Sequence, residues 1–344
     1  MNALRFILFP FATLYWLITS FRNFLFDRRI LKSNSFDLPV VCIGNLSMGG
    51  TGKTPHCEYL ITQLKEDYNT ALLSRGYGRK TNEFIEVEVT HQAWQVGDEP
   101  LQIKNKFPAL TVAVDRKRVN GVINLLYNYP NKDVILLDDA FQHRSIKAGF
   151  NILLTKFNAP FNSDYIFPVG NLREARKGHQ RADVIIITKC PKSITKDQMD
   201  SISSEISKTI PVYFTKINYE ETQSIFDNSK IQLDSASKVL LITGIADHSS
   251  ITKKLNNEEI KFKHLAFRDH YPFSEKDADK VSEIFDKFAT NNKIILTTEK
   301  DAMRLKNIEA FKKLPIYFIP IKIEFIAKEK EFHHQFLTYV SNNK

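Results

Sequence analysis

The segment VCIGNLSMGGTGKTP, residues 41–55, runs from a hydrophobic stretch into a glycine-rich turn that Lys53 and Thr54 follow directly. Backbone N–H groups in such a turn, together with the N-terminus of the next helix, surround phosphate oxygens. The lysine reaches the β- and γ-phosphates, and the threonine hydroxyl contacts Mg²⁺. The common pattern has glycine where this chain has Ser47, but the GGTGKT core and the preceding strand outweigh that difference. The predicted nucleotide-binding residues of this loop are Gly49, Gly50, Thr51, Gly52, Lys53 and Thr54.

The segment DVILLDDAFQHR, residues 133–144, is a second sign of phosphate chemistry. Its hydrophobic run ends in Asp138 and Asp139, which predicts two carboxylates at the carboxyl edge of a parallel sheet, where ligands of α/β proteins bind. A carboxylate at this point holds Mg²⁺ in phosphate-loop enzymes. Two aspartates after a strand can also be only a turn or a helix cap, but the phosphate loop upstream favours a metal site. We therefore predict that Thr54, Asp138 and Asp139 bind Mg²⁺.

Five other polar segments contain candidate site residues whose roles the residues alone leave open. They are SRGYGRK (74–80), VGDEP (96–100), VDRKRVNG (114–121), FPVGNLREARKGHQRAD (167–183) and FRDHYPF (267–273). The first is equally consistent with a basic turn, and Asp98 in the second with a turn carboxylate. The fourth is dense enough in arginine to bind phosphate groups. In the fifth, His270 follows Asp269, and a lone histidine is more often a surface or core residue.

Short β-branched runs alternate with helical patterns, which predicts an α/β fold with a doubly wound, mostly parallel sheet. The predicted strands of this sheet are 40–44, 70–74, 110–114, 133–138, 150–154 and 183–188, with a helix at 55–64 after the phosphate loop. A second series at 238–243, 262–267, 293–297 and 315–320 predicts a smaller α/β lobe. Residues 211–218, PVYFTKIN, are typical of a linking strand. We therefore expect an N-terminal hydrophobic segment (1–33), a phosphate-loop domain (34–212), and a strand linker with a C-terminal lobe (213–344).

The N-terminal run FILFPFATLYWLI, residues 6–18, is almost wholly apolar and is followed by aromatic residues interleaved with Arg22, Arg28, Arg29 and Lys32. It is too short to span a bilayer comfortably. A buried core helix is one alternative. A signal peptide is another, but an A-x-A-like cleavage site is missing and the nucleotide site follows closely. The aromatic and basic residues fit best a helix that lies in the headgroup region of an anionic membrane.

The composition is that of a folded protein, with 344 residues, 43% hydrophobic and 25% charged. A formal charge of +9 indicates an acidic partner: nucleic acid, anionic lipid or a phosphorylated substrate. The chain has none of the common nucleic-acid motifs and its basic residues are scattered, so we expect no nucleic acid as partner. Nor does the sequence indicate an obligatory protein partner. The three cysteines are odd in number and far apart, which favours a reducing compartment over a disulfide framework or a zinc site.

Seven motifs occur in order over residues 44–305: GNLSMGGTGKTP, SRGYGRK, VGDEP, LLDDAFQHR, FPVGNLREA, RDHYPF and TTEKDAMRL. Together with the hydrophobic N-terminus, they resemble the tetraacyldisaccharide 4′-kinases, the lipid A 4′-kinases of Gram-negative bacteria. Ser47 is compatible with that family's own loop. The resemblance implies a phosphate-loop domain with a smaller lobe. It also implies ATP- and Mg²⁺-dependent phosphorylation of a tetraacylated glucosamine disaccharide 1-phosphate, the lipid A (lipopolysaccharide) precursor. The site of action would be the cytoplasmic face of the inner membrane, where a peripheral or monotopic enzyme would contact anionic lipids.

The resemblance also implies roles for individual residues. Asp98 and His270 match the acid–base pair of the family, and Glu174 matches the carboxylate of its LRE motif. Asp138 and Asp139 match the metal-binding pair, with Asp139 as its catalytic member. Arg118 aligns less securely with an arginine that binds a phosphate of the substrate or nucleotide. The implied catalytic set is thus Lys53, Asp98, Asp139, Glu174 and His270.

Three other function classes are weaker interpretations. A regulatory GTPase needs Asn/Thr-Lys-x-Asp to select guanine, but the segment 188–191 ends in proline. A non-catalytic membrane adaptor with a vestigial nucleotide site would be expected to have lost Lys53, Thr54 or one of the aspartates, and all are present. A kinase of a soluble small molecule leaves the aromatic N-terminus without a function. No cysteine or free histidine lies in a nucleophile context, so the sequence does not indicate a covalent phosphoenzyme.

Overall fold

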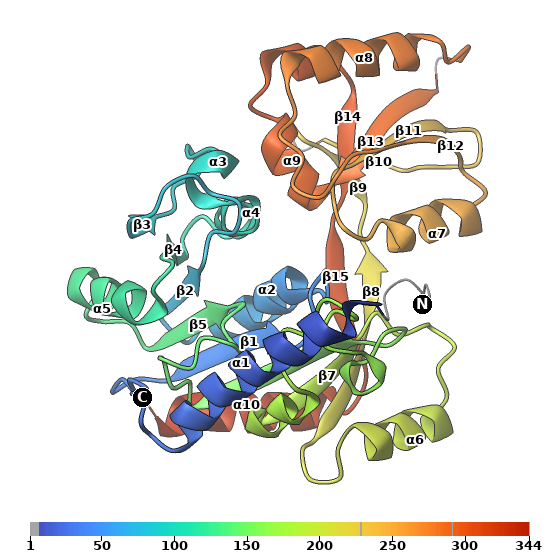
Figure 1. Cartoon of the computed structure of the whole chain (residues 1–344). Coiled ribbons are helices and arrows are strands. Elements are labelled where there is room, and N and C mark those ends of the chain that lie inside the picture. Colours follow the sequence, from blue (N-terminus) through green and yellow to red (C-terminus); the bar gives the residue numbers. More distant parts are fainter. Residues whose placement is uncertain (1–6, 228, 291, 344) are drawn as a thin grey trace.

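The computed structural model describes residues 7–227, 229–290 and 292–343, which form two lobes joined by two long strands (Figure 1). The strands of the larger lobe are β1 (Val40–Asn45), β2 (Thr70–Ser74), β3 (Ile85–Glu86), β4 (Thr111–Val114), β5 (Val134–Asp138), β6 (Phe150–Lys156), β7 (Val184–Thr188), β8 (Val212–Tyr219) and β15 (Ile321–Ala327). They lie in the order β15-β8-β7-β6-β1-β5-β2-β4-β3. All neighbours from β8 to β4 are parallel, and only β3 and β15 at the edges are antiparallel.

The central strands are hydrophobic runs because both faces of the sheet are covered. Every residue of β1, β2, β5 and β7 is buried. Alternate residues of β1 enter different cores: Val41 and Ile43 pack in the cluster that includes helix α2 (Lys53–Leu64), and Val40 and Cys42 in the cluster that includes α5 (Arg118–Asn128). The other helices of this lobe are α1 (Phe9–Asp27), α3 (Ala93–Val96), α4 (Asp98–Lys106), α6 (Lys196–Ile206) and α10 (Glu329–Asn342). The predicted doubly wound, mostly parallel fold is confirmed.

The smaller lobe has a second sheet, in the order β10-β9-β14-β13-β11-β12. Its strands are β9 (Thr222–Ser224), β10 (Lys230–Ile231), β11 (Lys238–Thr243), β12 (Lys261–Ala266), β13 (Lys293–Thr298) and β14 (Ile316–Ile319), and its helices are α7 (Ser249–Asn257), α8 (Glu275–Asp286) and α9 (Glu299–Leu305). The four strands predicted from the sequence form the parallel part of this sheet. No observed end differs from the predicted one by more than one residue.

The last segment of the chain returns to the larger lobe, which the sequence analysis did not anticipate. Strand β15 pairs antiparallel with β8 at the edge of the larger sheet. Helix α10 then packs Phe332, Phe336 and Val340 into the core of the larger lobe, beside Phe150 of β6. Residues of the larger lobe therefore lie on both sides of the smaller lobe in the sequence.

Helix α1 crosses the larger lobe on its outside (Figure 1). It carries a stripe of exposed apolar side chains spaced three or four residues apart: Phe11, Leu14, Ile18 and Phe21, between 56% and 64% exposed. Ala12 is its one buried residue, so the alternative of a buried core helix does not describe it. Within the described chain, the structure contains no helix of the length and apolarity needed to cross a bilayer. Residues 1–6, which include the first residue of the predicted apolar run, lie outside the described part.

Candidate active site

The glycine-rich loop connects the buried end of β1 to the first turn of α2. Gly49 (φ +99°) and Gly52 (φ +86°) adopt the left-handed backbone conformation, which only glycine adopts readily. Gly52 is the residue that precedes α2, so Lys53 and Thr54 are the first two residues of that helix. The N-terminus of α2 is therefore open to an anion.

Two side-chain contacts hold the loop in place. Asn45, the last residue of β1, donates from Nδ2 to Oγ1 of Thr51 at 2.9 Å. Thr188, at the end of β7, donates from its hydroxyl to the backbone oxygen of Thr51, also at 2.9 Å. The loop is thus anchored to two strands of the parallel sheet, as a rigid phosphate site requires.

A cleft of about 440 Å³ opens at this loop and extends between the lobes. One part is lined by residues 48–56, including all six loop residues predicted to bind a nucleotide. Another part is apolar. It is lined by Ile217 and Tyr219 of β8, Ile251 of α7, Ile319 at the end of β14 and Ile323 of β15. The hydrogen-bond donors of the loop can bind the phosphates of a nucleotide, and the apolar part of the cleft can contact its base.

Asp139 stands at the mouth of the phosphate loop. Its backbone is left-handed (φ +48°), and its carboxylate lies 3.6 Å from Nζ of Lys53 and 2.9 Å from an Nη of Arg173. Burial opposes ionisation of this carboxyl, but the two cations outweigh it and lower the pKa of Asp139 below its ordinary value. Asp139 is therefore a carboxylate that faces the cleft and can contact a metal ion or the phosphate site.

Asp138 lies deeper, 2% exposed, and accepts a hydrogen bond from the hydroxyl of Ser74 at 2.9 Å. Burial, and then the nearby charges of Glu99 and Asp139, raise its pKa to about 6. A cation beside this group would relieve that excess of negative charge. The hydroxyl of Thr54 and the carboxylates of Asp138 and Asp139 are the hard oxygen donors that Mg²⁺ prefers, so these residues fit the predicted ion.

Within residues 7–227, 229–290 and 292–343, no group of three or more histidine, cysteine or acidic side chains could hold a metal ion by itself. In phosphate-loop sites, Mg²⁺ is usually bound by only one or two protein oxygens, and nucleotide phosphates and water complete its coordination.

Asp98 and His270 meet across the two lobes. Nδ1 of His270 lies 3.0 Å from Oδ2 of Asp98, whose residue is 3% exposed. Asp98 is the first residue of α4, directly after Gly97, whose left-handed φ of +92° lets the chain pass close to Gly76. Burial opposes ionisation of Asp98, but His270, Lys300 and Arg304 overcome it and lower its pKa below the ordinary value.

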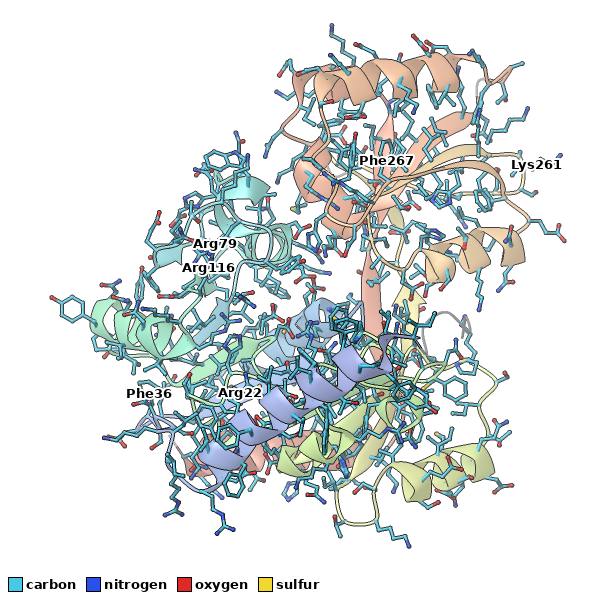
Figure 2. The ribbon with its side chains drawn as sticks, viewed as in Figure 1. Arg22, Phe36, Arg79, Arg116, Lys261 and Phe267 are labelled. Atoms are coloured by element: carbon cyan, nitrogen blue, oxygen red, sulfur yellow. The ribbon has the colours of Figure 1, made fainter. Side chains whose placement is uncertain are left out.

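The loop that carries His270 is held by aromatic packing within the smaller lobe. Phe267, labelled in Figure 2, lies 4.6 Å from Tyr271 and 5.1 Å from Phe273 between ring centroids. His270 itself has a left-handed backbone (φ +53°), and its backbone N–H donates to the backbone oxygen of Gly244 at 3.0 Å. These contacts aim the imidazole at the larger lobe.

Glu174 is fully buried beside α1 and is not among the residues that line the cleft. Its carboxylate accepts hydrogen bonds from Asn23 of α1 at 2.6 Å, Arg181 at 2.7 Å and Gln142 at 3.2 Å. The adjacent Arg173 accepts a hydrogen bond on its backbone oxygen from the hydroxyl of Tyr15, at 3.0 Å. Glu174 thus connects α1 to the segment that carries Arg173.

Arg22 of α1, labelled in Figure 2, adds a contact to the same side of the site by donating to the backbone oxygen of Gln142 at 3.3 Å. The polar face of α1 therefore lies against the active-site segments, and its apolar stripe faces outward.

The structure does not bring Arg118 into the cleft. Its side chain is 1% exposed, and its two Nη groups donate to the backbone oxygens of Asp115 (2.6 Å) and Asp138 (3.0 Å). In this position the guanidinium supports the end of β5. The predicted contact between Arg118 and a phosphate stays a prediction.

Four charged residues outside the predicted catalytic, nucleotide-binding and metal-binding sets lie at the site; of these, only Arg173 belongs to a segment that was predicted to bind phosphate groups. Arg173 pairs with Asp139, Glu99 and Lys300 flank His270, and Arg304 lies 3.6 Å from Asp98. All four are part of the quoted motifs NLREA, VGDEP and TTEKDAMRL. Their presence in those motifs was the available signal, but only the packing of the lobes shows which of them face the catalytic candidates.

Comparison with known proteins gives a consistent result. The family model described as Tetraacyldisaccharide-1-P 4'-kinase matches residues 4–341. The chain is similar to the tetraacyldisaccharide 4'-kinases of Flavobacterium johnsoniae (45% identity; 100% of this chain, 99% of the relative) and Bacteroides thetaiotaomicron (39%; 98% and 93%). A solved structure of LpxK from Aquifex aeolicus in complex with ATP superimposes with a TM-score of 0.78 at 29% identity, covering 98% of this chain and 99% of that one.

Proposed function

The chain belongs to the tetraacyldisaccharide-1-P 4'-kinase family, and from this premise we propose how its residues transfer phosphate from ATP to the lipid A precursor. The acceptor is the 4′-hydroxyl of a tetraacylated glucosamine disaccharide 1-phosphate. One observation supports the assignment of roles above all others: the phosphate loop and His270 line one interlobe cleft, and Asp98 lies buried directly behind His270, 3.0 Å from its Nδ1.

Asp98 accepts the proton of the sugar hydroxyl. A sugar hydroxyl does not ionise unaided near neutral pH, so a carboxylate must take its proton as the new bond to phosphorus forms. The lowered pKa of Asp98 keeps it ionised, and His270 at 3.0 Å orients it. As the proton moves from the hydroxyl to a carboxylate oxygen of Asp98, the sugar oxygen bonds to the γ-phosphorus, the bond from that phosphorus to the β,γ-bridging oxygen breaks, and ADP leaves.

Lys53 and the loop N–H groups bind the phosphates of ATP and stabilise the charge that develops during transfer. Thr54, Asp138 and Asp139 would hold Mg²⁺, which when bound neutralises phosphate oxygens. Arg173 holds Asp139 in place through its 2.9 Å contact. Glu174 ties the segment that carries Arg173 to α1 through Asn23, and Tyr15 of the same helix bonds the backbone oxygen of Arg173.

The exposed stripe of α1 contacts the membrane. The substrate carries four acyl chains, and exposing them to water costs about 0.8 kcal/mol per CH₂ group, so the enzyme meets it at the bilayer surface. The apolar face of α1 points outward and consists of neighbouring exposed side chains, those of Phe11, Leu14, Ile18 and Phe21. Contiguous exposed apolar surface of this kind marks an interaction site, whereas single exposed hydrophobic residues do not. The opposite face of α1 contacts the site, so the cleft is held near the headgroups. We place the enzyme peripherally on the cytoplasmic face of the inner membrane, where its ATP is available.

The direct test is incubation of the purified protein with ATP, Mg²⁺ and the tetraacyl disaccharide 1-phosphate in mixed micelles, with the product measured by mass spectrometry. A gain of one phosphate on the distal sugar supports the proposal, and the Asp98→Asn variant provides the matched inactive control. Activity only on soluble sugars, or only with GTP, would contradict it.

A further inference from the structure

A cluster of two carboxylates and one ammonium group lies where α2, α4 and α9 meet, outside the groups assigned above. Nζ of Lys106, on α4, lies 2.7 Å from Oε2 of Glu58 on α2 and 3.3 Å from Oε1 of Glu299 on α9. Gln102 donates to the other oxygen of Glu58 at 2.8 Å. The side chains of Glu58 and Glu299 are only 6% and 10% exposed. One cation therefore serves two buried carboxylates that come from different lobes.

This cluster has an excess of negative charge. Burial and then the charge of Glu58 raise the pKa of Glu299 to about 7, and burial also raises the pKa of Glu58. The other charged group that acts on both is Glu220, just beyond β8. Oε2 of Glu299 is buried and makes no hydrogen bond within the described part of the chain. Without Lys106, two largely buried carboxylates would face each other with no cation between them, which is strongly unfavourable.

Helix α9 also carries the cations of the catalytic pair. Lys300 follows Glu299 directly, and its Nζ lies 3.0 Å from Glu99 and 3.1 Å from Nε2 of His270. Arg304, one turn further, lies 3.6 Å from Asp98. The distance of these cations from Asp98, the first residue of α4, therefore depends on where α9 lies against α4.

Apolar packing alone does not fix that position. Leu101 and Ile103 of α4 share one hydrophobic cluster with Ala302 and Leu305 of α9. Such contacts hold the helices together without direction, because hydrophobic attraction depends on area rather than geometry. Polar contacts add direction: Lys300 bonds Glu99 and Lys306 bonds Asn105 across the same two helices, and the charged cluster adds a buried ionic contact that also ties both helices to α2.

On the basis of the proposed kinase function, we propose that Lys106 is a positioning residue. By bridging Glu58 and Glu299, it fixes α9 against the phosphate-loop helix and so holds Lys300 and Arg304 at the Asp98–His270 pair. Lys106 does not touch the substrate or ATP in this scheme; it acts through α9.

The test compares Lys106→Met, the double variant Lys106→Met/Glu299→Gln, and the control Lys306→Met. Lys306 lies at the same interface, where its Nζ bonds Oδ1 of Asn105 at 2.5 Å without a carboxylate partner. The measurements are kcat and KM for ATP, the pH profile of kcat, and the NMR resonances of the His270 ring in the enzyme without substrate. The charged groups that face Asp98 in this profile are His270, Glu99, Lys300, Asp301 and Arg304.

We expect Lys106→Met to lower kcat at least tenfold, to move the acid limb of the kcat profile to higher pH, and to shift the His270 resonances. The limb moves upward because Asp98 loses the cations that lower its pKa. Replacing Glu299 by Gln in the same protein removes the repulsion and should restore at least half of each change, while Lys306→Met should alter none of them.

An acid limb and His270 resonances in Lys106→Met that match those of Lys306→Met would overturn the proposal, as would a double variant no better than Lys106→Met. If Lys106→Met does not fold, the double variant decides: because it lacks the bridge, His270 resonances that still differ from those of the wild type support the proposal, and wild-type resonances contradict it. A wild-type protein without kinase activity would refute the proposed function, whereas the His270 resonances would still decide the role of Lys106.

Discussion

The ammonium nitrogen of Lys300 lies 3.1 Å from Nε2 of His270, and this contact determines which ring nitrogen carries the hydrogen. A lysine ammonium can only donate, so Nε2 accepts. The ring hydrogen of a neutral imidazole then lies on Nδ1, the atom 3.0 Å from Asp98. His270 therefore lies between a cation and a carboxylate, and its ring links Lys300 of the smaller lobe to Asp98 of the larger lobe.

Asp98 and His270 should behave as one catalytic unit. We expect Asp98→Asn to lower kcat by about 10² to 10⁴, the range of general-base effects, and His270→Ala to lower it less. Groups that act together lose most of their effect at the first deletion, so the double variant should be little worse than Asp98→Asn. Steady-state kinetics measures this, and calorimetric ATP binding controls for folding. Strictly additive losses would show that the two residues do not cooperate.

The pH dependence should report the cations around Asp98. Its pKa is lowered in the folded enzyme, so the active ionised form persists until the pH falls through that lowered value. Lys300→Met removes one of the cations that lower it, and we therefore expect the acid limb of kcat/KM to move to higher pH. Lys312→Met, which alters an exposed lysine paired with Glu309, is the control and should leave the limb in place. An unchanged limb in Lys300→Met would mean that Asp98 is not the titrating base.

Phosphate binding should depend on the first residues of α2. We expect Lys53→Ala or Thr54→Ala to lower kcat by about a hundredfold or more, as the loss of one transition-state donor does. Lys65→Ala, just after the far end of the same helix, is the matched control because its side chain is 48% exposed and pairs with Glu66. Near-normal turnover in a folded Lys53→Ala variant would refute the assignment.

Substitutions of Asp138 and Asp139 should have different effects on the rate in a Mg²⁺ titration. Loss of a carboxylate that mainly binds metal raises the Mg²⁺ concentration needed for half-maximal rate. We expect this effect for Asp138→Asn. Asp139 also contacts Lys53 and Arg173, so Asp139→Asn should in addition depress kcat at saturating Mg²⁺. Wild-type rates for both variants across the titration would show that the two aspartates only form a turn and do not bind Mg²⁺.

Membrane binding should depend on the outer face of α1. Replacing Phe11, Leu14, Ile18 and Phe21 by Ser should abolish sedimentation with anionic vesicles and impair turnover of the lipid, while ATP binding persists. Deletion of residues 1–26 should also abolish sedimentation, but it removes Tyr15 and Asn23 and so disturbs the site as well. High salt should weaken binding of the wild type only in part, because apolar insertion is unscreened.

The exposed pair Ile123 and Tyr127 of α5 provides the control for that experiment. Serine at both positions removes apolar surface elsewhere on the larger lobe and should leave sedimentation unchanged. If the α1 variant sediments like the wild type, membrane contact lies elsewhere.

Local patterns predicted much of this structure. The strands and the phosphate loop are continuous segments whose hydrophobic runs and glycines carry their own signal. The approach of His270 to Asp98 came only from the family resemblance, because nothing local relates residues that lie in different lobes. Lys300, Arg304 and Lys106 could not be placed at all, since a lysine or arginine in a helix has the same local pattern whether it faces solvent or a buried carboxylate.

Two further features of the structure also lack a local sequence signal. The return of β15 to the larger sheet is an antiparallel edge pairing between distant segments, which has no sequence periodicity of its own. Arg118 follows a strand as a phosphate-binding arginine would, but its side chain turns inward to the carbonyl oxygens at the end of β5. Long side chains of this kind can reach either place, and the sequence does not distinguish them.

The return of β15 and α10 also has a consequence for how the protein is made and divided. Everything between β8 and β15 is an insertion in the larger lobe, and its two ends are neighbours: Tyr219 pairs with Ile321, and the N–H of Glu220 donates to the oxygen of Pro320 at 2.9 Å. On a ribosome, the nucleotide lobe cannot complete its sheet until the whole smaller lobe and β15 have emerged. No single cut can release either lobe intact, but a tight turn that joins β8 directly to β15 would excise the smaller lobe and leave the larger one continuous.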